Sequence, residues 1–221
     1  MEIIPDVAER VTALTDFMMA VVAIIGMVQF RRDVIPASWK INLWTAVYLL
    51  FIAAALIGTF HHGLVLSTTA YDLSWLLIIL CLGMMIGLFV VALTYDVFGL
   101  IAARKILPVM IVIALGFFGF SWSQGQDFSL FLAYEAFGLL AALIGYSYLA
   151  FLRRPGGLSL AIAVFITIVA AVVQATKAMS YTIVVPFDHN ANYHLIQIVG
   201  VLLLTHGIRQ SVNTSSAQSQ Q

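Results

Sequence analysis

The stretch LLIILCLGMMIGLFVVALTY, residues 76–95, decides the fold class of this chain. None of its side chains is charged, and it contains Cys81, the only cysteine of the sequence. A helix rises about 1.5 Å per residue, so this stretch is long enough to cross the hydrocarbon core of a bilayer, which is about 30 Å thick. The sequence therefore predicts a membrane-spanning helix here, and a lone cysteine inside it forms no disulfide within the chain.

The composition of the whole chain is that of a membrane protein. Of its 221 residues, 62% are hydrophobic and 9% are charged, and the formal net charge is +0. The mean hydropathy is +1.05. A soluble domain needs a charged exterior, so it could not accommodate this much apolar surface. A chain without net positive charge also lacks the basic surface typical of nucleic-acid binding, so we expect no nucleic-acid partner.

Comparable apolar stretches recur along the chain, separated by segments that contain charged or turn-forming residues, such as RRDVIPASWK at 31–40 and RRPGG at 153–157. The sequence therefore predicts an all-α fold, a seven-helix transmembrane bundle. We expect its spans at residues 11–30, 40–64, 72–95, 106–122, 128–152, 158–184 and 190–208. Residues 1–208 would form this single domain, and residues 209–221 a polar, disordered cytoplasmic tail.

Basic residues predict the orientation of the bundle. They gather in alternate connections and after the last span: Arg31, Arg32, Lys40, Arg104, Lys105, Arg153, Arg154 and Arg209. Because such residues stay on the cytoplasmic side of a membrane, the N-terminus is expected outside and the C-terminus in the cytoplasm. We expect a multi-pass integral membrane protein, of the plasma (inner) membrane if the source is bacterial.

Ionisable residues inside spans are costly and are by default functional hypotheses. On the expected topology most of them share the outer depth: Asp16, His61, His62, Asp72, Glu135, Lys177, Tyr181, Asp188, His189 and His194. Structural roles compete with functional ones. Asp188 or Asn190 would cap the last helix, His62 would be an interfacial residue, and Lys177 would pair with Glu135 or Asp16. These roles do not explain why three spans bring His, Asp and His to one level, as a metal site with an open position requires.

Two motifs at this depth are similar to those of a known superfamily. In FHHGLVLSTTAYD, residues 60–72, Asp72 follows His61 by eleven residues, and DHNANYH, residues 188–194, ends on His194. Both resemble motifs of the CREST superfamily of seven-span membrane proteins, which includes alkaline ceramidases, adiponectin-receptor-type proteins and GPI-anchor lipid-remodelling proteins. The resemblance implies a Zn²⁺ ion that is bound by three histidines. It also implies a water molecule, hydrogen-bonded to a serine and an aspartate, that attacks an amide or ester bond of a membrane lipid.

This chain departs from the family pattern at two positions. Asn190 stands where the first histidine of the seventh span is expected, and Ile57 stands at the serine position, with Thr59 the nearest hydroxyl. Asparagine is a poor zinc ligand, because zinc prefers imidazole or thiolate. The predicted metal ligands are therefore His61 and His194, and the third ligand remains open between His189, His62 and Asn190.

Three functions follow from these residues. The first is a zinc-dependent, ceramidase-like hydrolase of a membrane lipid, in which Asp72, Thr59 and Lys177 are the candidate catalytic residues and Asp72 is the general base. Lys177, Tyr181 or Glu135 would line the cavity and stabilise charge. The second is a receptor, sensor or structural relative that has lost the chemistry. The third, less favoured, is a transporter or retinal-type pump, for which Lys177 is the only lysine expected inside the membrane.

Overall fold

The computed structural model describes residues 2–32, 38–125 and 128–218, and it confirms the all-α seven-helix bundle. The helices and the one short hairpin are α1 (Val7–Arg32), α2 (Trp39–Gly63), α3 (Thr68–Phe98), α4 (Leu100–Ser123), α5 (Phe128–Phe151), α6 (Gly157–Thr176), β1 (Tyr181–Thr182), β2 (Pro186–Phe187) and α7 (His189–Gln218). All seven helices are long and apolar enough to cross a membrane, so this is a multi-pass membrane protein. Parts of two predicted connections, residues 33–37 and 126–127, lie outside the described residues.

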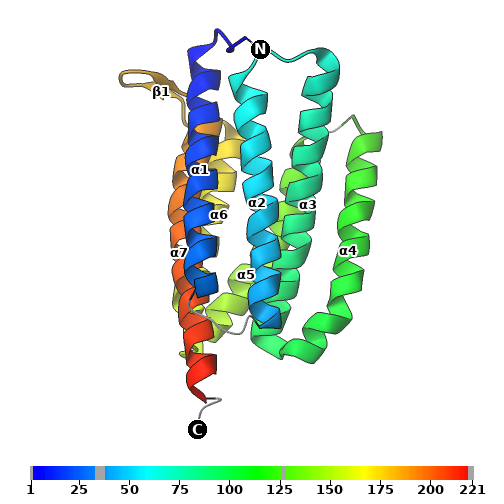
Figure 1. Cartoon of the computed structure of the whole chain (residues 1–221), viewed down its shortest axis with the longest axis vertical. Helices are drawn as coiled ribbons and strands as arrows, with labels where there is room; N and C mark the ends of the chain where they lie inside the picture. The colour runs from blue at the N-terminus through cyan, green and yellow to red at the C-terminus, as the bar shows by residue number, and fades with distance from the viewer. Residues whose placement is uncertain (1, 33–37, 126–127, 219–221) are drawn as a thin grey trace.

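Six of the helices form a closed ring, and α4 lies outside it. Neighbours in the ring pack in the order α1, α2, α3, α5, α6, α7, and α7 packs against α1 to close it. Helix α4 packs mainly on α3 and barely touches α5 (Figure 1). Consecutive helices run in opposite directions, so the two termini lie at opposite ends of the bundle (Figure 1).

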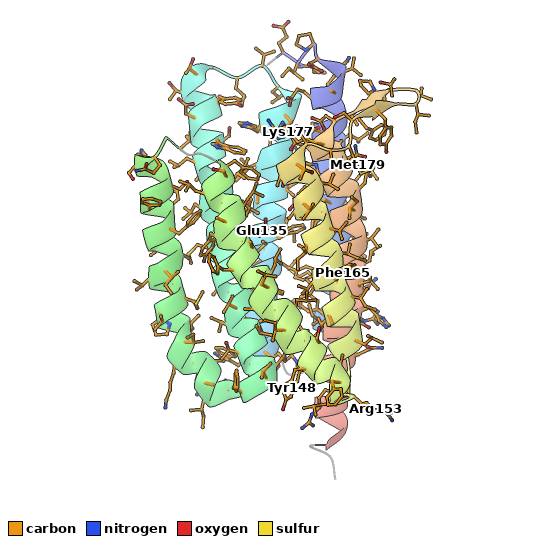
Figure 2. The ribbon with its side chains drawn as sticks, turned by 180° about the vertical axis from the view of Figure 1, so that it is seen from behind. Glu135, Tyr148, Arg153, Phe165, Lys177 and Met179 are labelled. Atoms are coloured by element: carbon orange, nitrogen blue, oxygen red, sulfur yellow. The ribbon has the colours of Figure 1, made fainter. Side chains whose placement is uncertain are left out.

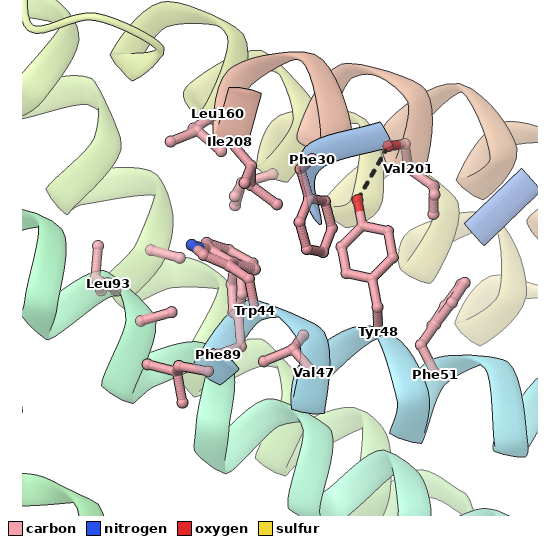
Figure 3. Packing of buried hydrophobic residues seen from close by; sticks show 14 of the residues in the cluster. Phe30, Trp44, Val47, Tyr48, Phe51, Phe89, Leu93, Leu160, Val201 and Ile208 are labelled. Carbon is pink, nitrogen blue, oxygen red and sulfur yellow. Dashed lines mark hydrogen bonds between the residues drawn. The ribbon is translucent and has the colours of Figure 1, made fainter. Parts of the chain in front are cut away.

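The interior of the ring is filled by large apolar and aromatic side chains. Trp44 and Phe89 pack edge to face with ring centroids 5.8 Å apart, and Phe30 packs the same way on Tyr48 at 5.1 Å. Tyr48 is fully enclosed, and its hydroxyl lies 2.7 Å from Thr205 Oγ1 and 3.5 Å from the carbonyl oxygen of Val201 (Figure 3). This core ties α1, α2, α3 and α7 together.

The turn between α3 and α4 is tighter than the sequence analysis predicts. The expected connection LIAARK is helical, and Gly99 alone separates the two helices. Gly99 has φ 84°, a backbone conformation that glycine adopts without the steric cost that other residues meet. Arg104 and Lys105 consequently lie in the first turns of α4, at the same end of the bundle as the other predicted cytoplasmic basic residues.

Helix α6 ends earlier than predicted, at Thr176 instead of residue 184. Lys177 ends it with φ 52°, and the chain then forms the β1–β2 hairpin, in which Tyr181 pairs with Phe187. Lys177 and Tyr181 are therefore not inside a span, which corrects the prediction. The hairpin projects sideways from the bundle (Figure 1), and at its tip Ile183 and Val184 are 77% and 90% exposed.

Helix α7 is longer than predicted, because it continues to Gln218 where a disordered tail was expected from residue 209. Ile208 and Val212 are buried against the bundle, and the Lys40 ammonium donates a hydrogen bond to Ser211 Oγ at 2.9 Å. These contacts hold the helix beyond the predicted span. The last residues of the expected tail, 219–221, lie outside the described part of the chain.

A buried polar cluster holds four helices together at the C-terminal end. Lys40 Nζ lies 2.6 Å from Asp96 Oδ1, and the two side chains are only 11% and 5% exposed. The Tyr146 hydroxyl donates to Asp96 Oδ2 at 3.2 Å, and the Lys40 ammonium also lies over the Tyr95 ring. Since every charge in the cluster has a partner, the cluster joins α2, α3, α5 and α7 without leaving a buried ion unpaired.

Candidate functional site

The opposite end of the bundle contains a cavity of about 280 Å³, which we call the outer chamber. Its polar lining comes from α1, α2, α6 and α7: Asp16, His62, Gln174, Lys177, His189, Asn190 and His194. Apolar and aromatic side chains complete the wall, among them Met19, Phe51, Ile78, Leu82, Phe128 and Tyr193. The chamber is therefore amphiphilic, with ionisable groups next to a hydrophobic surface.

His194 and Asp16 form the best-defined contact of the chamber. His194 Nε2 lies 3.3 Å from Asp16 Oδ1, and both side chains are less than a tenth exposed. His194 Nδ1 lies 3.0 Å from Thr15 Oγ1, and the Thr15 hydroxyl itself donates to the carbonyl oxygen of Thr12 at 2.9 Å. When the Thr15 hydroxyl donates to Thr12, its oxygen accepts from the Nδ1–H of His194.

A hydrogen on Nδ1 of His194 determines which atoms of the His194–Asp16 contact can carry a proton. With the hydrogen on Nδ1, a neutral imidazole presents a lone pair at Nε2, and two lone pairs facing each other would repel. In this tautomer the contact holds one proton, carried by Nε2 or by Asp16 Oδ1. The other oxygen of the carboxyl group, Oδ2, is buried and has no hydrogen-bond partner among the residues that the structure describes. The pair can therefore take up or release a proton, and its second carboxyl oxygen lies buried against Gly58.

Gly58 makes room for this carboxyl group. A Cβ atom at position 58 would lie 2.7 Å from Asp16 Oδ2, closer than real Cβ contacts allow. The α1–α2 interface therefore accommodates Asp16 because α2 has no side chain at this point.

His62 faces the chamber and is held by a residue of α1. His62 Nδ1 lies 2.7 Å from Glu9 Oε2. Residues next to this pair also align the two helices, since Ile4 N–H donates to the carbonyl oxygen of Gly63 at 3.1 Å and Val65 N–H donates to that of Glu2 at 2.9 Å. His62 thus contacts Glu9 at the chamber wall. The sequence left it open whether His62 is an interfacial residue or a third metal ligand.

His61, a predicted metal ligand, points instead toward α3. His61 Nδ1 lies 2.7 Å from Ser74 Oγ, and the imidazole packs on the rings of Tyr71 and Trp75, with centroids 4.2 and 5.4 Å away. Asp72 is exposed to solvent. Neither His61 nor Asp72 belongs to the lining of the outer chamber. His61 and Asp72 therefore do not line the chamber beside His194, as the resemblance implies they would.

Asp188 caps α7, one of the two roles that the sequence left open. Its Oδ1 accepts hydrogen bonds from the Ala191 N–H at 2.8 Å and from the Thr12 hydroxyl at 2.9 Å. His189 is the first residue of α7 and lines the chamber. Asn190 Oδ1 accepts a hydrogen bond from Gln174 Nε2 at 3.3 Å, so the asparagine links α7 to α6.

Of the remaining predicted residues, Thr59 and Tyr181 interact within their own elements, and Lys177 reaches the chamber. The Thr59 hydroxyl donates to the carbonyl oxygen of Ala55 at 2.9 Å within α2. Tyr181 stacks on Phe187 in the hairpin. Lys177 reaches the chamber from the end of α6 (Figure 2), but within the described part of the chain it pairs with neither Glu135 nor Asp16. The expected buried ion pair of Lys177 is therefore not formed.

Three supporting residues of α1 are not among the site residues predicted from the sequence. Glu9 and Thr12 hold His62 and Asp188, and Thr15 holds His194. A signal for them existed, because Glu9, Thr12 and Asp16 are spaced three and four residues apart and so form a polar stripe on one face of an otherwise apolar helix.

The donor groups at this end do not form a metal site as they are placed. Among residues 2–32, 38–125 and 128–218, no three His, Cys, Asp or Glu side chains come together in a way that could hold a metal ion. His61 is engaged with Ser74, and Asn190 with Gln174. Zinc binding therefore stays a prediction from the sequence.

Comparisons with known proteins give a family but no activity. Residues 11–213 match the model of a protein family that is described as a family of unknown function. No curated protein and no solved structure matches the chain. The function must therefore be argued from the chamber itself.

Proposed function

Since the chain belongs to this family of unknown function, DUF6962, we propose its function from the outer chamber: it binds a membrane amphiphile there and hydrolyses an amide or ester bond of it. One observation is the basis of this proposal. His194 Nε2 and Asp16 Oδ1 lie 3.3 Å apart in a cavity whose remaining wall is largely apolar and aromatic. Such a cavity suits a molecule with a polar linkage and a hydrocarbon part.

The side of the membrane follows from the basic residues. The chamber lies at the end formed by the starts of α1, α3, α5 and α7, whereas eight of the ten lysines and arginines are near the other end. By the positive-inside rule, the chamber faces the outside and the C-terminus the cytoplasm. The substrate would accordingly be a lipid of the outer leaflet.

The proposed reaction needs a water molecule and a proton carrier. The water oxygen bonds to the carbonyl carbon of the substrate, and the bond from that carbon to nitrogen or oxygen breaks. The water proton passes to the His194–Asp16 pair and from there to the leaving nitrogen or oxygen. Lys177, at the chamber wall, would stabilise the negative charge that develops on the carbonyl oxygen. No step of this scheme depends on zinc.

A receptor or sensor that binds the amphiphile without cleaving it is the second candidate. It is favoured by the position of His61 and Asp72, two residues of the catalytic set that the resemblance implies, since neither lines the chamber. The two candidates share the binding step and differ only in turnover.

One experiment distinguishes the hydrolase from the receptor. The purified protein in nanodiscs is incubated with ester-linked, amide-linked and ether-linked amphiphiles. We expect release of the free acid from the ester or amide compound, none from the ether, and loss of release in His194→Ala. Mass spectrometry measures the products. Binding of all three compounds without any product would contradict hydrolysis and support the receptor, and absence of both binding and product would contradict the proposal as a whole.

Metal content is a separate measurement on the same preparations. If the zinc site implied by the resemblance exists, native protein from metal-replete medium contains stoichiometric zinc, and His61→Ala and His194→Ala lose it. Native protein without zinc, but with turnover, would show that the chamber works without a metal.

A further inference from the structure

A second, smaller cavity lies inside the ring of helices, next to the outer chamber. It has a volume of about 60 Å³, and we call it the inner cavity. Phe51 and Tyr193 line both cavities, so these two side chains form the wall between them. Glu135, on α5, faces the inner cavity and lies nearer the middle of the bundle than Lys177 (Figure 2).

Two hydrogen-bond acceptors in the inner cavity have no partner in the described part of the chain. Glu135 is 3% exposed, and its Oε2 makes no hydrogen bond. Gln197, on α7, is 7% exposed, and its Oε1 makes none either. Buried polar atoms in folded proteins are nearly always hydrogen-bonded, so two orphan oxygens lining one cavity indicate that a bound donor completes them.

The charge of the cavity indicates what kind of donor. Among the described residues that line it, Glu135 is the one acid, and no lysine, arginine or histidine is present. The other titratable groups are the hydroxyls of Tyr48 and Tyr193, and Phe51 and Phe89 add aromatic rings. An acid in a cavity that four aromatic rings help to line is an environment that binds ammonium groups, through charge-assisted hydrogen bonds and cation–π contact.

We propose that the inner cavity binds a compact alkylammonium group, which donates hydrogen bonds to Glu135 and Gln197 and contacts the aromatic wall. A water molecule needs at least about 15 Å³, so the cavity of about 60 Å³ has room for about four water-sized groups. A short primary amine is of this size. This inference goes beyond hydrolysis in the outer chamber and does not depend on it, because the two cavities use different acids.

The same ammonium group could belong to a small soluble amine or to the end of an amphiphile. The probes are therefore propylammonium and dodecylammonium, each compared with the neutral alcohol of the same chain length. Affinity is measured from the rise of the thermal unfolding midpoint with ligand concentration, on the full chain in nanodiscs. We expect at least one of the amines to stabilise the protein and its alcohol to do so much more weakly.

Two variants test the assignment of the acceptors. Glu135→Gln keeps the shape and removes the charge, so we expect the dissociation constant of the amine to rise about ten- to a hundredfold. Gln197→Leu removes the second acceptor, and we expect a rise of about two- to tenfold. Asp72→Asn removes an exposed acid from the same half of the bundle and should leave amine affinity unchanged.

Two results would overturn the proposal. The first is no stabilisation by either amine, which would mean that a neutral Glu135 and water satisfy the cavity. The second is a rise of the unfolding midpoint that is equal for the amine and its alcohol, or a rise with the amine that is equal for native protein and Glu135→Gln. Turnover in the outer chamber is measured separately with His194→Ala, so failure of one proposal is distinguishable from failure of the other.

Discussion

Replacing Asp96 by alanine is expected to lower the free energy of unfolding by about 3–5 kcal/mol, because it leaves a buried lysine without its counter-ion. Lys40 is 11% exposed at the side chain and lies 2.6 Å from Asp96 Oδ1. After the substitution its ammonium would keep only Ser211 Oγ and the face of the Tyr95 ring. These neutral groups do not compensate a buried charge.

The measurement is a denaturant titration in mixed micelles, followed by helix content. The double variant Lys40→Met with Asp96→Leu removes both charges and should recover most of the loss, since apolar residues of similar size often replace a buried ion pair without cost. Tyr146→Phe removes one hydrogen bond to the carboxylate and should cost about 1.5–3 kcal/mol. A loss within about 0.5 kcal/mol for Asp96→Ala, the range of ordinary surface substitutions, would show that the pair does not stabilise the bundle.

Asp16→Asn is expected to lower turnover of the chamber's substrate by about 10²–10⁴-fold, the usual contribution of a general acid–base group. Asparagine has nearly the same shape as aspartate, but it cannot share a proton with His194 Nε2. The folded structure should persist, because the substitution removes a buried acid and not a packing group. The ratio kcat/KM is measured on the amphiphile that is cleaved by the native protein.

Gly58→Ala is a matched control, because it tests the position of the Asp16 carboxyl group without removing the acid. It keeps the His194–Asp16 pair but places a methyl group against Asp16 Oδ2, so turnover should fall while the acid itself is retained. Asp72→Asn, at an exposed position, should leave turnover unchanged. Full activity of Asp16→Asn, or a loss in Asp72→Asn equal to that of Asp16→Asn, would contradict the assignment of the proton carrier to the outer chamber.

Much of the fold could be predicted, because lipid imposes a strong constraint on sequence. In a membrane every backbone polar group must be bonded internally, so long apolar stretches form helices, and their number follows from the breaks between them. The ends of the helices were harder. Gly99 joins α3 and α4 with one residue, and Lys177 ends α6 in the left-handed region, neither of which is visible in the hydropathy of the stretch.

The sequence predicts the end of the bundle at which the candidate site lies, but not the contacts between its residues. The alternation of helices brings Asp16, His62 and His194 to one end of the molecule, as the positions of the ionisable residues in the spans indicate. The expected grouping of His61 and Asp72 with His194 is not found at the chamber, and Asp16, given only a secondary role, is the partner of His194.

The sequence by itself therefore determined the membrane class, the seven helices and the end of the bundle at which the ionisable residues meet. Tertiary structure alone decided which of two adjacent histidines faces the chamber. His61 and His62 are about 100° apart around α2, so a rotation of that helix by about 100° exchanges them. Packing sets the rotation: Ser74, Tyr71 and Trp75 of α3 hold His61, and Glu9 of α1 holds His62. Periodicity defines the faces of a helix, but only its neighbours define which face turns inward.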